Sequence, residues 1–276
     1  MGYNTTGLCH RVGIANEKML TKALNYYFQK GKNPLKLREL FPNRNLLFKH
    51  QGGTQQVADM SIHDADTDEK LAGVSIKHHK TGTYDHINTT KIDTFVPGDM
   101  HQYMKDGIKA IKEEFAAQEE RVEVARAAVD SLFLSLWERW DSAAIRALLQ
   151  VIHGRTPALL LINTNNQKLS CYKESAFLEL AQYPYNDKMS YFLRAARAKT
   201  SRQIWRRDDL GNEVCTHLRL RMVLNNGVTA LLGLSSSNKT SVPTIKVQQD
   251  NVDALLEQTQ PYSIEGMQIV QRIQIG

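Results

Sequence analysis

The sequence contains few cysteines and no long apolar run. Its three cysteines, Cys9, Cys171 and Cys215, form no C-x-x-C pair. This spacing disfavours both a disulfide framework and a zinc finger. No window has the uncharged apolar length that a membrane span needs, and the first residues lack the apolar core of a signal peptide. We therefore expect a cytoplasmic protein that makes no contact with a membrane.

The overall composition is ordinary, whereas the charge balance favours one sign. Among the 276 residues, 42% are hydrophobic and 23% are charged, as is usual for a globular protein. A chain of this length can bury a substantial core. The formal net charge is +6, which favours an anionic partner such as a nucleic acid.

Residues 51–80 show a period-two pattern on both sides of an acidic turn. Each of two short segments has an apolar face, formed by Ala58, Met60 and Ile62 in the first and by Ala72, Val74 and Ile76 in the second. Strand side chains alternate between faces, so this pattern predicts a β-hairpin. Asp59, Ser75 and Lys77 fall on its polar face.

The turn of this hairpin has the spacing D-x-D-x-D at Asp64, Asp66 and Asp68. A calcium loop would need glycine at the sixth position and a bidentate glutamate at the twelfth. Those positions hold Glu69 and Ser75. We therefore interpret this segment as a solvated turn.

Helical patterns lie on both sides of the hairpin. Residues 11–30 predict an amphipathic helix, with Glu17 either as a solvated acid of its first turns or as a carboxylate facing a metal. Residues 101–153 predict a long helical region with a break near Ser131 or at Asp141-Ser142. The apolar run 158–163 fits a central strand. The expected fold class is α/β, with a central mixed β-sheet flanked by helices and a basic, β-rich C-terminal half.

Basic residues are concentrated between residues 194 and 221. His217, Arg219 and Arg221 alternate there with leucine and methionine, which predicts a strand with one apolar and one cationic face. The pair Asn226-Gly227 predicts a hairpin turn. Residues 235–247 are rich in Ser, Thr, Asn and Lys and include a proline that is typical of an edge strand.

An aspartate and a lysine on neighbouring strands suit the hydrolysis of a phosphodiester. Asp59 can bind Mg²⁺, which prefers oxygen ligands, and the main-chain carbonyl of Ile76 is a further candidate ligand. Lys77 can orient or deprotonate a water molecule or neutralise the phosphate. The alternative to these catalytic roles is that Asp59 is a turn residue at the end of a strand and that Lys77 is a solvated lysine.

This arrangement resembles the PD-(D/E)xK nuclease superfamily, and within it the type II restriction endonucleases. The resemblance rests on Gly52-Gly53 before Ala58-Asp59, on Ser75-Ile76-Lys77-His78, and on a preceding helix with Asn16-Glu17. It covers about the first third of the chain. It implies a restriction-endonuclease-like core, Mg²⁺-dependent cleavage of double-stranded DNA at a short specific site, and Asp59 and Lys77 as catalytic residues.

The chain departs from the family pattern at Ser75, where the motif normally has an acid. Some branches of the family carry serine there and supply the missing carboxylate from elsewhere. The candidates in this chain are Glu17, Asp85 and Asp93, in that order. Glu17 is accordingly expected to assist Asp59 in catalysis and in metal binding, and Ser75 to occupy the degenerate position.

We expect a single endonuclease domain, with a catalytic core at about residues 10–165 and a DNA-contacting part at about 166–276. Two symmetric sites cleave both strands of a palindrome most simply, which implies a homodimer. The residues expected to contact DNA are His78, Arg202, Arg206, Arg219, Arg221, Asn238 and Lys239.

Two alternatives remain open. One is a homing, repair or phage-defence nuclease of the same fold. The other is a catalytically inactive nucleic-acid-binding module, for which the serine at position 75 is the motive.

Overall fold

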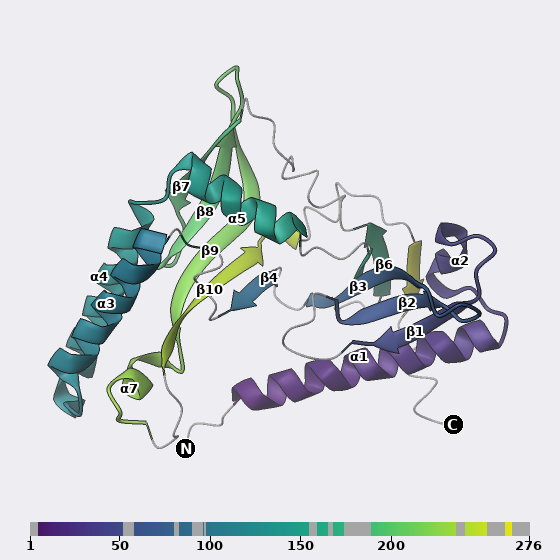
Figure 1. Cartoon of the computed structure of the whole chain (residues 1–276), viewed down its shortest axis with the longest axis horizontal. Coiled ribbons are helices and arrows are strands. Elements are labelled where there is room, and N and C mark those ends of the chain that lie inside the picture. The colour runs from purple at the N-terminus through teal and green to yellow at the C-terminus, as the bar shows by residue number, and fades with distance from the viewer. Residues whose placement is uncertain are drawn as a thin grey trace. The chain divides into compact units, whose positions relative to one another are not determined.

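The computed structural model describes residues 5–51, 58–79, 83–89, 96, 98–154, 159–164, 168–173, 189–235, 241–252 and 263–266. The chain forms two compact units (Figure 1). The first unit contains Met1–Gly82, Arg155–Leu178 and Val252–Gly276, and the second contains Thr83–Gly154 and Glu179–Asn251. The units are thus assembled from interleaved segments rather than from two parts that meet near residue 165.

The first unit consists of a mixed β-sheet and helices. Its helical elements are α1 (Thr5–Gln29), η1 (Pro34–Lys36) and α2 (Leu37–Leu40). Its strands are β1 (Leu46–His50), β2 (Met60–Asp64), β3 (Lys70–His79), β5 (Leu159–Thr164), β6 (Lys168–Lys173) and β11 (Ser263–Gly266). They lie in the order β1-β2-β3-β5-β6-β11, and β3 and β5 are parallel whereas the other neighbouring pairs are antiparallel.

The predicted hairpin is present as β2 and β3. Its register places Met60 opposite Val74 and Ile62 opposite Ala72, so the two apolar faces coincide. The apolar run expected at 158–163 forms β5, which lies within the sheet between β3 and β6. Period-two patterning therefore predicted β2 and β3 correctly, and the continuous apolar run predicted β5.

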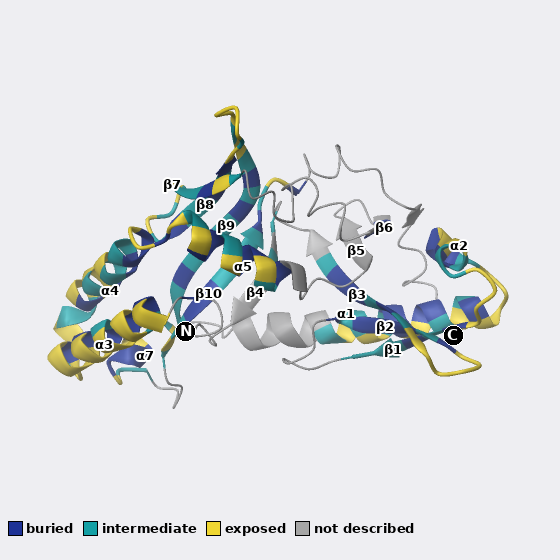
Figure 2. Cartoon of the chain, turned by 45° about the horizontal axis from the view of Figure 1, so that its top comes forward, coloured by how far each residue is buried: buried dark blue, intermediate teal, exposed yellow. Residues whose placement is uncertain are grey.

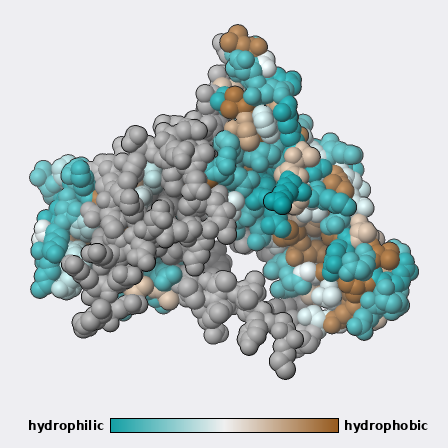
Figure 3. Space-filling model, turned by 180° about the vertical axis from the view of Figure 1, so that it is seen from behind, coloured by the Kyte–Doolittle hydropathy of each residue, from teal (hydrophilic) through white to brown (hydrophobic). Residues whose placement is uncertain are grey.

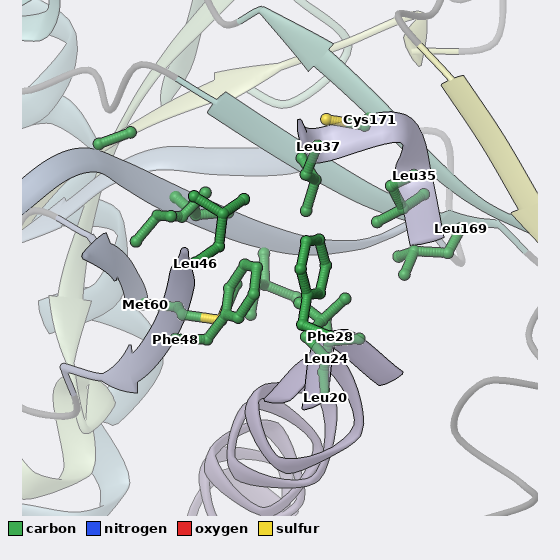
Figure 4. Packing of buried hydrophobic residues seen from close by; sticks show 14 residues of the cluster. Leu20, Leu24, Phe28, Leu35, Leu37, Leu46, Phe48, Met60, Leu169 and Cys171 are labelled. Carbon is green, nitrogen blue, oxygen red and sulfur yellow. The ribbon is translucent and has the colours of Figure 1, made fainter. Parts of the chain in front are cut away.

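The apolar face of this sheet packs against α1. Leu20, Leu24 and Phe28 of α1 approach Phe48 and Met60 of the strands (Figure 4). The rings of Phe28 and Phe48 have centroids 5.0 Å apart. Burial of such side chains contributes roughly 1.5–3 kcal/mol each, so this face holds the helix in place.

The second unit combines an antiparallel sheet with helices. Its strands are β4 (Tyr84–Thr89), β7 (Ser190–Ala195), β8 (Ser201–Arg207), β9 (Glu213–Asn225) and β10 (Val242–Gln249), in the order β4-β10-β9-β8-β7. Its helical elements are α3 (Gly98–Phe115), η3 (Glu119–Arg121), α4 (Val122–Trp137), α5 (Ser142–Gly154) and α7 (Gly227–Leu231). The chain is therefore a mixed α/β protein, as expected.

The helical region of residues 101–153 breaks at two places. The predicted break at Asp141-Ser142 is confirmed, because Asp141 Oδ1 accepts a hydrogen bond of 2.7 Å from Ala144 N–H and caps α5. The predicted alternative at Ser131 is wrong, since α4 continues through it. The break that we did not predict lies after Phe115, where Ala117 has a φ of +58°.

Three strand predictions in this unit need correction. Asn226 and Gly227 do adopt positive φ angles, but they lead into helix α7 rather than into the second strand of a hairpin. Strand β10 lies between β9 and β4, so it is not an edge strand. Pro243 is tolerated there because β4 pairs only with residues from Ile245 onward. The polar segment after residue 80 contains β4, which we had not predicted.

Candidate functional site

Asp59 is held at the end of β2 by three neighbouring residues. Its Oδ2 accepts a hydrogen bond of 2.7 Å from the N–H of Ile76 and one of 3.1 Å from the hydroxyl of Ser75. Its own N–H donates to the carbonyl of Val74 at 3.0 Å. The carboxylate is thus fixed by the neighbouring strand, and its second oxygen, Oδ1, makes no hydrogen bond with the residues that the structure describes.

The register explains how these residues meet. Met60 pairs with Val74, and Asp59, the residue before it, donates its own N–H to the carbonyl of Val74, next to Ser75. Lys77 lies two residues further along β3 and therefore on the same face as Ser75. The N–H and carbonyl of one strand residue point to the same edge, so the carbonyl of Ile76 is directed toward the side where Asp59 lies. Asp59 is thus in contact with Ser75 and Ile76, and Lys77 lies on the strand face that carries Ser75.

The role of Ser75 in the structure differs from the role that its position in the motif suggests. It is 5% exposed and donates its hydroxyl to Asp59. A hydroxyl held in this way orients the carboxylate rather than replacing a missing one. Ser75 is therefore a positioning residue for Asp59.

Glu17 does not join this group. Its Oε2 lies 3.2 Å from Nε2 of His50. His50 pairs with Met60 and shares the face of β1 that carries Leu46 and Phe48, which α1 covers. Glu17 thus reaches the helix-covered face, whereas Asp59 contacts Ser75 on the opposite side. The expectation that Glu17 supplies the missing carboxylate does not fit this geometry.

The other two candidate acids lie outside the described part of the first unit. Asp85 belongs to the second unit, where its Oδ1 accepts a hydrogen bond of 2.7 Å from Gln248. Asp93 lies outside the described residues, as do Gly52 and Gly53. Among the residues described, no group of three or more His, Cys, Asp or Glu side chains is arranged to hold a metal ion.

The acidic turn of the hairpin is neutralised by basic side chains. Arg44 Nη1 lies 2.8 Å from Asp64 Oδ2, and Lys49 pairs with Asp68. The hydrogen bond from Arg44 holds the pKa of Asp64 below its ordinary value. Asp64 is 4% exposed, so our interpretation of a solvated turn is wrong at this residue. The turn is a structural feature fixed by ion pairs.

A polar chain on the first sheet was not apparent from the sequence. Gln51 donates to the hydroxyl of Ser61, which lies 2.9 Å from Nε2 of His63, and Nδ1 of His63 lies 3.0 Å from the carbonyl of Asp68. The order serine–histidine–aspartate is that of a hydrolase triad. Ser61 is completely buried, however, so no substrate can reach its hydroxyl. This series of hydrogen bonds stabilises the sheet.

The cationic face of β9 is present as predicted. Leu218, Leu220 and Met222 are buried, while Arg219 and Arg221 are partly exposed on the other face. Figure 2 shows buried and intermediate residues alternating along β9. Arg219 Nη2 lies 2.9 Å from Asp250 Oδ1. Burial raises the pKa of Asp250 above its ordinary value, and Arg219 opposes that shift.

Arg202 and Arg206 lie on the opposite, helix-covered face. Arg202 is directly opposite the buried Leu220, and its guanidinium carbon lies 5.9 Å from the ring centroid of Trp137 in α4. Arg206 is 8% exposed and its Nη1 lies 3.8 Å from Met189 Sδ. Their placement does not fit the predicted contact with DNA. The basic composition of residues 194–221 indicated a cluster of cationic side chains, but it did not show which of them lie on which face of the second sheet.

The remaining predicted contacts are outside the described part. Asn238 and Lys239 belong to the undescribed segment 236–240. His78 lies on β3 opposite Asn163, although its side chain is not described. The buried thiol of Cys171, whose pKa burial raises to about 12, has no reactive character.

Within the described ranges, no helix combines the length and the apolar character that crossing a bilayer requires. No family model matches this chain, and comparisons with curated proteins and with solved structures give no match either.

Proposed function

We propose that this chain is a Mg²⁺-dependent endonuclease that hydrolyses phosphodiester bonds in double-stranded DNA. The observation that supports this proposal is the carboxylate of Asp59, which Ser75 and Ile76 fix beside the face that carries Lys77. A catalytic carboxylate must be held in one geometry, and hydrogen bonds to one of its oxygens leave the other for a ligand.

The donor set fits a hard cation. Mg²⁺ is usually bound through one or two carboxylates and keeps several water molecules. Asp59 would provide the carboxylate, and the carbonyl of Ile76 a second oxygen. When bound, the cation supplies charge that stabilises a phosphate in its transition state. Lys77 would hold a proton near the attacking water or offset the negative charge of the phosphate.

The finer features of the proposal come from the resemblance to the type II restriction endonucleases. They are cleavage at a short specific site, a restriction-endonuclease-like core around the first sheet, and a homodimer that cleaves both strands. The mixed sheet and helix α1 of the first unit are compatible with such a core. Arg219 and Arg221 would contribute contacts with the DNA.

The test is cleavage of plasmid DNA with Mg²⁺ by single-residue variants. Lys77→Ala and Asp59→Asn should each lower the rate by at least about 100-fold, which is the lower range for removal of an acid–base or charge-stabilising group. Lys70→Ala is the matched control, because Lys70 is an exposed lysine at the other end of β3. Undiminished cleavage by Lys77→Ala would refute the assignment.

Ser75→Ala separates positioning from direct catalysis. Loss of its hydroxyl removes one of the two hydrogen bonds on Asp59 Oδ2, a change of about 0.5–1.5 kcal/mol. We expect cleavage to weaken by a smaller factor than in Asp59→Asn and to recover with Ser75→Thr, which restores a hydroxyl. Equal losses in Ser75→Ala and Asp59→Asn would instead indicate that Ser75 contacts the reacting groups.

A second candidate is an inactive nucleic-acid-binding module. The observation in its favour is that Glu17 contacts His50 on the helix-covered face, which leaves Asp59 as the single carboxylate of the described site. Calorimetry with Mg²⁺ and Mn²⁺ decides between the two, because an inactive module would bind neither ion while still binding DNA.

The biological role within the nuclease class is decided by the cleavage products. Mapping the ends produced from a random-sequence DNA library would show a short fixed site for a restriction enzyme. A long single site or structure-dependent cleavage would favour a homing, repair or phage-defence nuclease.

A further inference from the structure

The sheet of the second unit has one face that no described helix covers. Helices α4 and α5 contact the other face, where Tyr191 N–H donates to Ser142 Oγ at 2.9 Å. In the view from behind, the upper part of this unit shows mainly hydrophilic residues (Figure 3). The face without a helix is the one that carries Arg219 and Arg221.

Most charges on or beside this face have a partner. Glu213 contacts both Arg194 and Arg207, Asp250 contacts Arg219, and Asp85 accepts a hydrogen bond from Gln248. These contacts hold the strands and loops of the unit to one another. Glu213 and Asp250 thereby offset two of the three arginine charges.

Arg221 and Lys246 differ from the other basic residues. They are direct cross-strand partners on β9 and β10, and both are partly exposed. Among the described residues neither has an ion pair or a side-chain hydrogen bond, and Nε of Arg221 is buried without an acceptor. Directly opposed residues of an antiparallel pair have Cβ atoms about 4.5–5.5 Å apart, so these like charges repel one another.

The same cross-strand row extends to β8. Ser201 lies directly opposite Arg221, is completely buried, and has a hydroxyl with no hydrogen-bond partner in the described part of the chain. Buried polar groups without partners are rare in folded proteins and each needs an explanation. The hydroxyl of Ser201 is out of reach of a ligand in this structure, whereas the two neighbouring cations are partly exposed and are of the type that binds phosphate.

We propose that the partly exposed side chains of Arg221 and Lys246 bind a phosphate group of a nucleic-acid backbone on the face of the second sheet that no described helix covers. The identity of the polyanion rests on the proposed function, whereas the anion site itself rests on the cross-strand pair. A phosphate between the two side chains converts their repulsion into two charge-assisted contacts. Lys246 lies in the segment 235–247, which the sequence indicated as a source of DNA contacts, whereas Ser201 was not singled out by the sequence pattern.

The experiment measures binding of a short fluorescent DNA duplex by the full chain in EDTA, at salt concentrations between about 50 and 200 mM. Each lost phosphate contact should reduce the slope of log affinity against log salt by about 0.9. Arg221→Gln and Lys246→Gln should each show such a loss and a several-fold weaker affinity. Arg126→Gln is the control, since Arg126 is an exposed arginine of α4 that pairs with Glu123.

The outcomes separate the possible sources of phosphate. If Arg221→Gln and Lys246→Gln bind the duplex with the affinity and slope of Arg126→Gln, the proposal fails. It also fails if only binding of inorganic pyrophosphate is lost, because the site would then serve a free anion. Arg221→Lys, which keeps the charge, should retain most of the slope and excludes a folding defect as the cause.

This experiment is independent of cleavage because it contains no divalent cation. Normal cleavage by Lys77→Ala together with a reduced slope in Lys246→Gln would reject the proposed catalytic site and retain the anion site. The reverse result would reject the anion site alone.

Discussion

The two sheets have the same layout but differ in how their polar faces are satisfied. Each has an apolar face covered by helices and a second face with polar side chains. On the first sheet the acids and hydroxyls are paired, as with Asp64 and Arg44 or Ser75 and Asp59. Every buried side-chain nitrogen or oxygen that lacks a hydrogen bond among the described residues belongs to the second unit. The paired charges of the first sheet stabilise its fold, whereas the unpaired, partly exposed cations of the second sheet indicate a site for an anionic ligand.

The apolar faces are expected to carry the stability of both units. Phe48→Ala in the first sheet should cost about 3–5 kcal/mol and Leu220→Ala in the second about 2–5 kcal/mol, since both side chains are almost fully buried. Denaturant unfolding measures both values. Leu210→Ala is the control, because Leu210 is 84% exposed. A small effect at Leu220 would show that the second sheet is held mainly by its polar face.

The paired acids of the first sheet should make its stability depend on pH. The pKa of Asp64 is lower in the folded chain than its ordinary value of 3.8, so its contribution is present above that pH and is lost as the pH falls through the folded value. Asp64→Asn should therefore reduce the loss of stability below about pH 4. Thermal unfolding between about pH 2 and 7 measures the effect.

A matched variant controls for the charge that Asp64→Asn removes. Asp66→Asn removes a negative charge from an exposed residue of the same turn. If the two variants gave the same pH profile, the general charge of the turn rather than the pair with Arg44 would be responsible.

The unpaired charges of the second sheet should slightly lower its free energy of unfolding, whereas the paired acids of the first sheet raise theirs. Lys246→Gln relieves the repulsion from Arg221 and should raise the unfolding free energy by roughly 0.2–1 kcal/mol in the absence of DNA. High salt should abolish this gain by screening. A destabilised Lys246→Gln would indicate that the lysine has a structural partner and would weaken the comparison between the two sheets.

Period-two patterning was sufficient to predict β2, β3 and β9, because each has an apolar face, and a continuous apolar run was sufficient to predict β5. It also placed Asp59 and Lys77 on neighbouring strands. It could not place Glu17, since the side of the sheet that a helix residue reaches depends on packing between elements distant in sequence. It could not separate Arg202 from Arg219, because faces of different strands are related only through their register.

The interleaved construction of the two units has a consequence for synthesis of the chain. The first sheet needs β11 at residues 263–266, and the second sheet joins β4 at residues 84–89 to β10 at residues 242–249. The first sheet cannot be completed on the ribosome before residue 266 has emerged, and the second cannot be completed before residue 249 has emerged. Strand β4 therefore lacks its partner strand until β10 has been synthesised, and a fragment ending near residue 165 would contain neither complete unit.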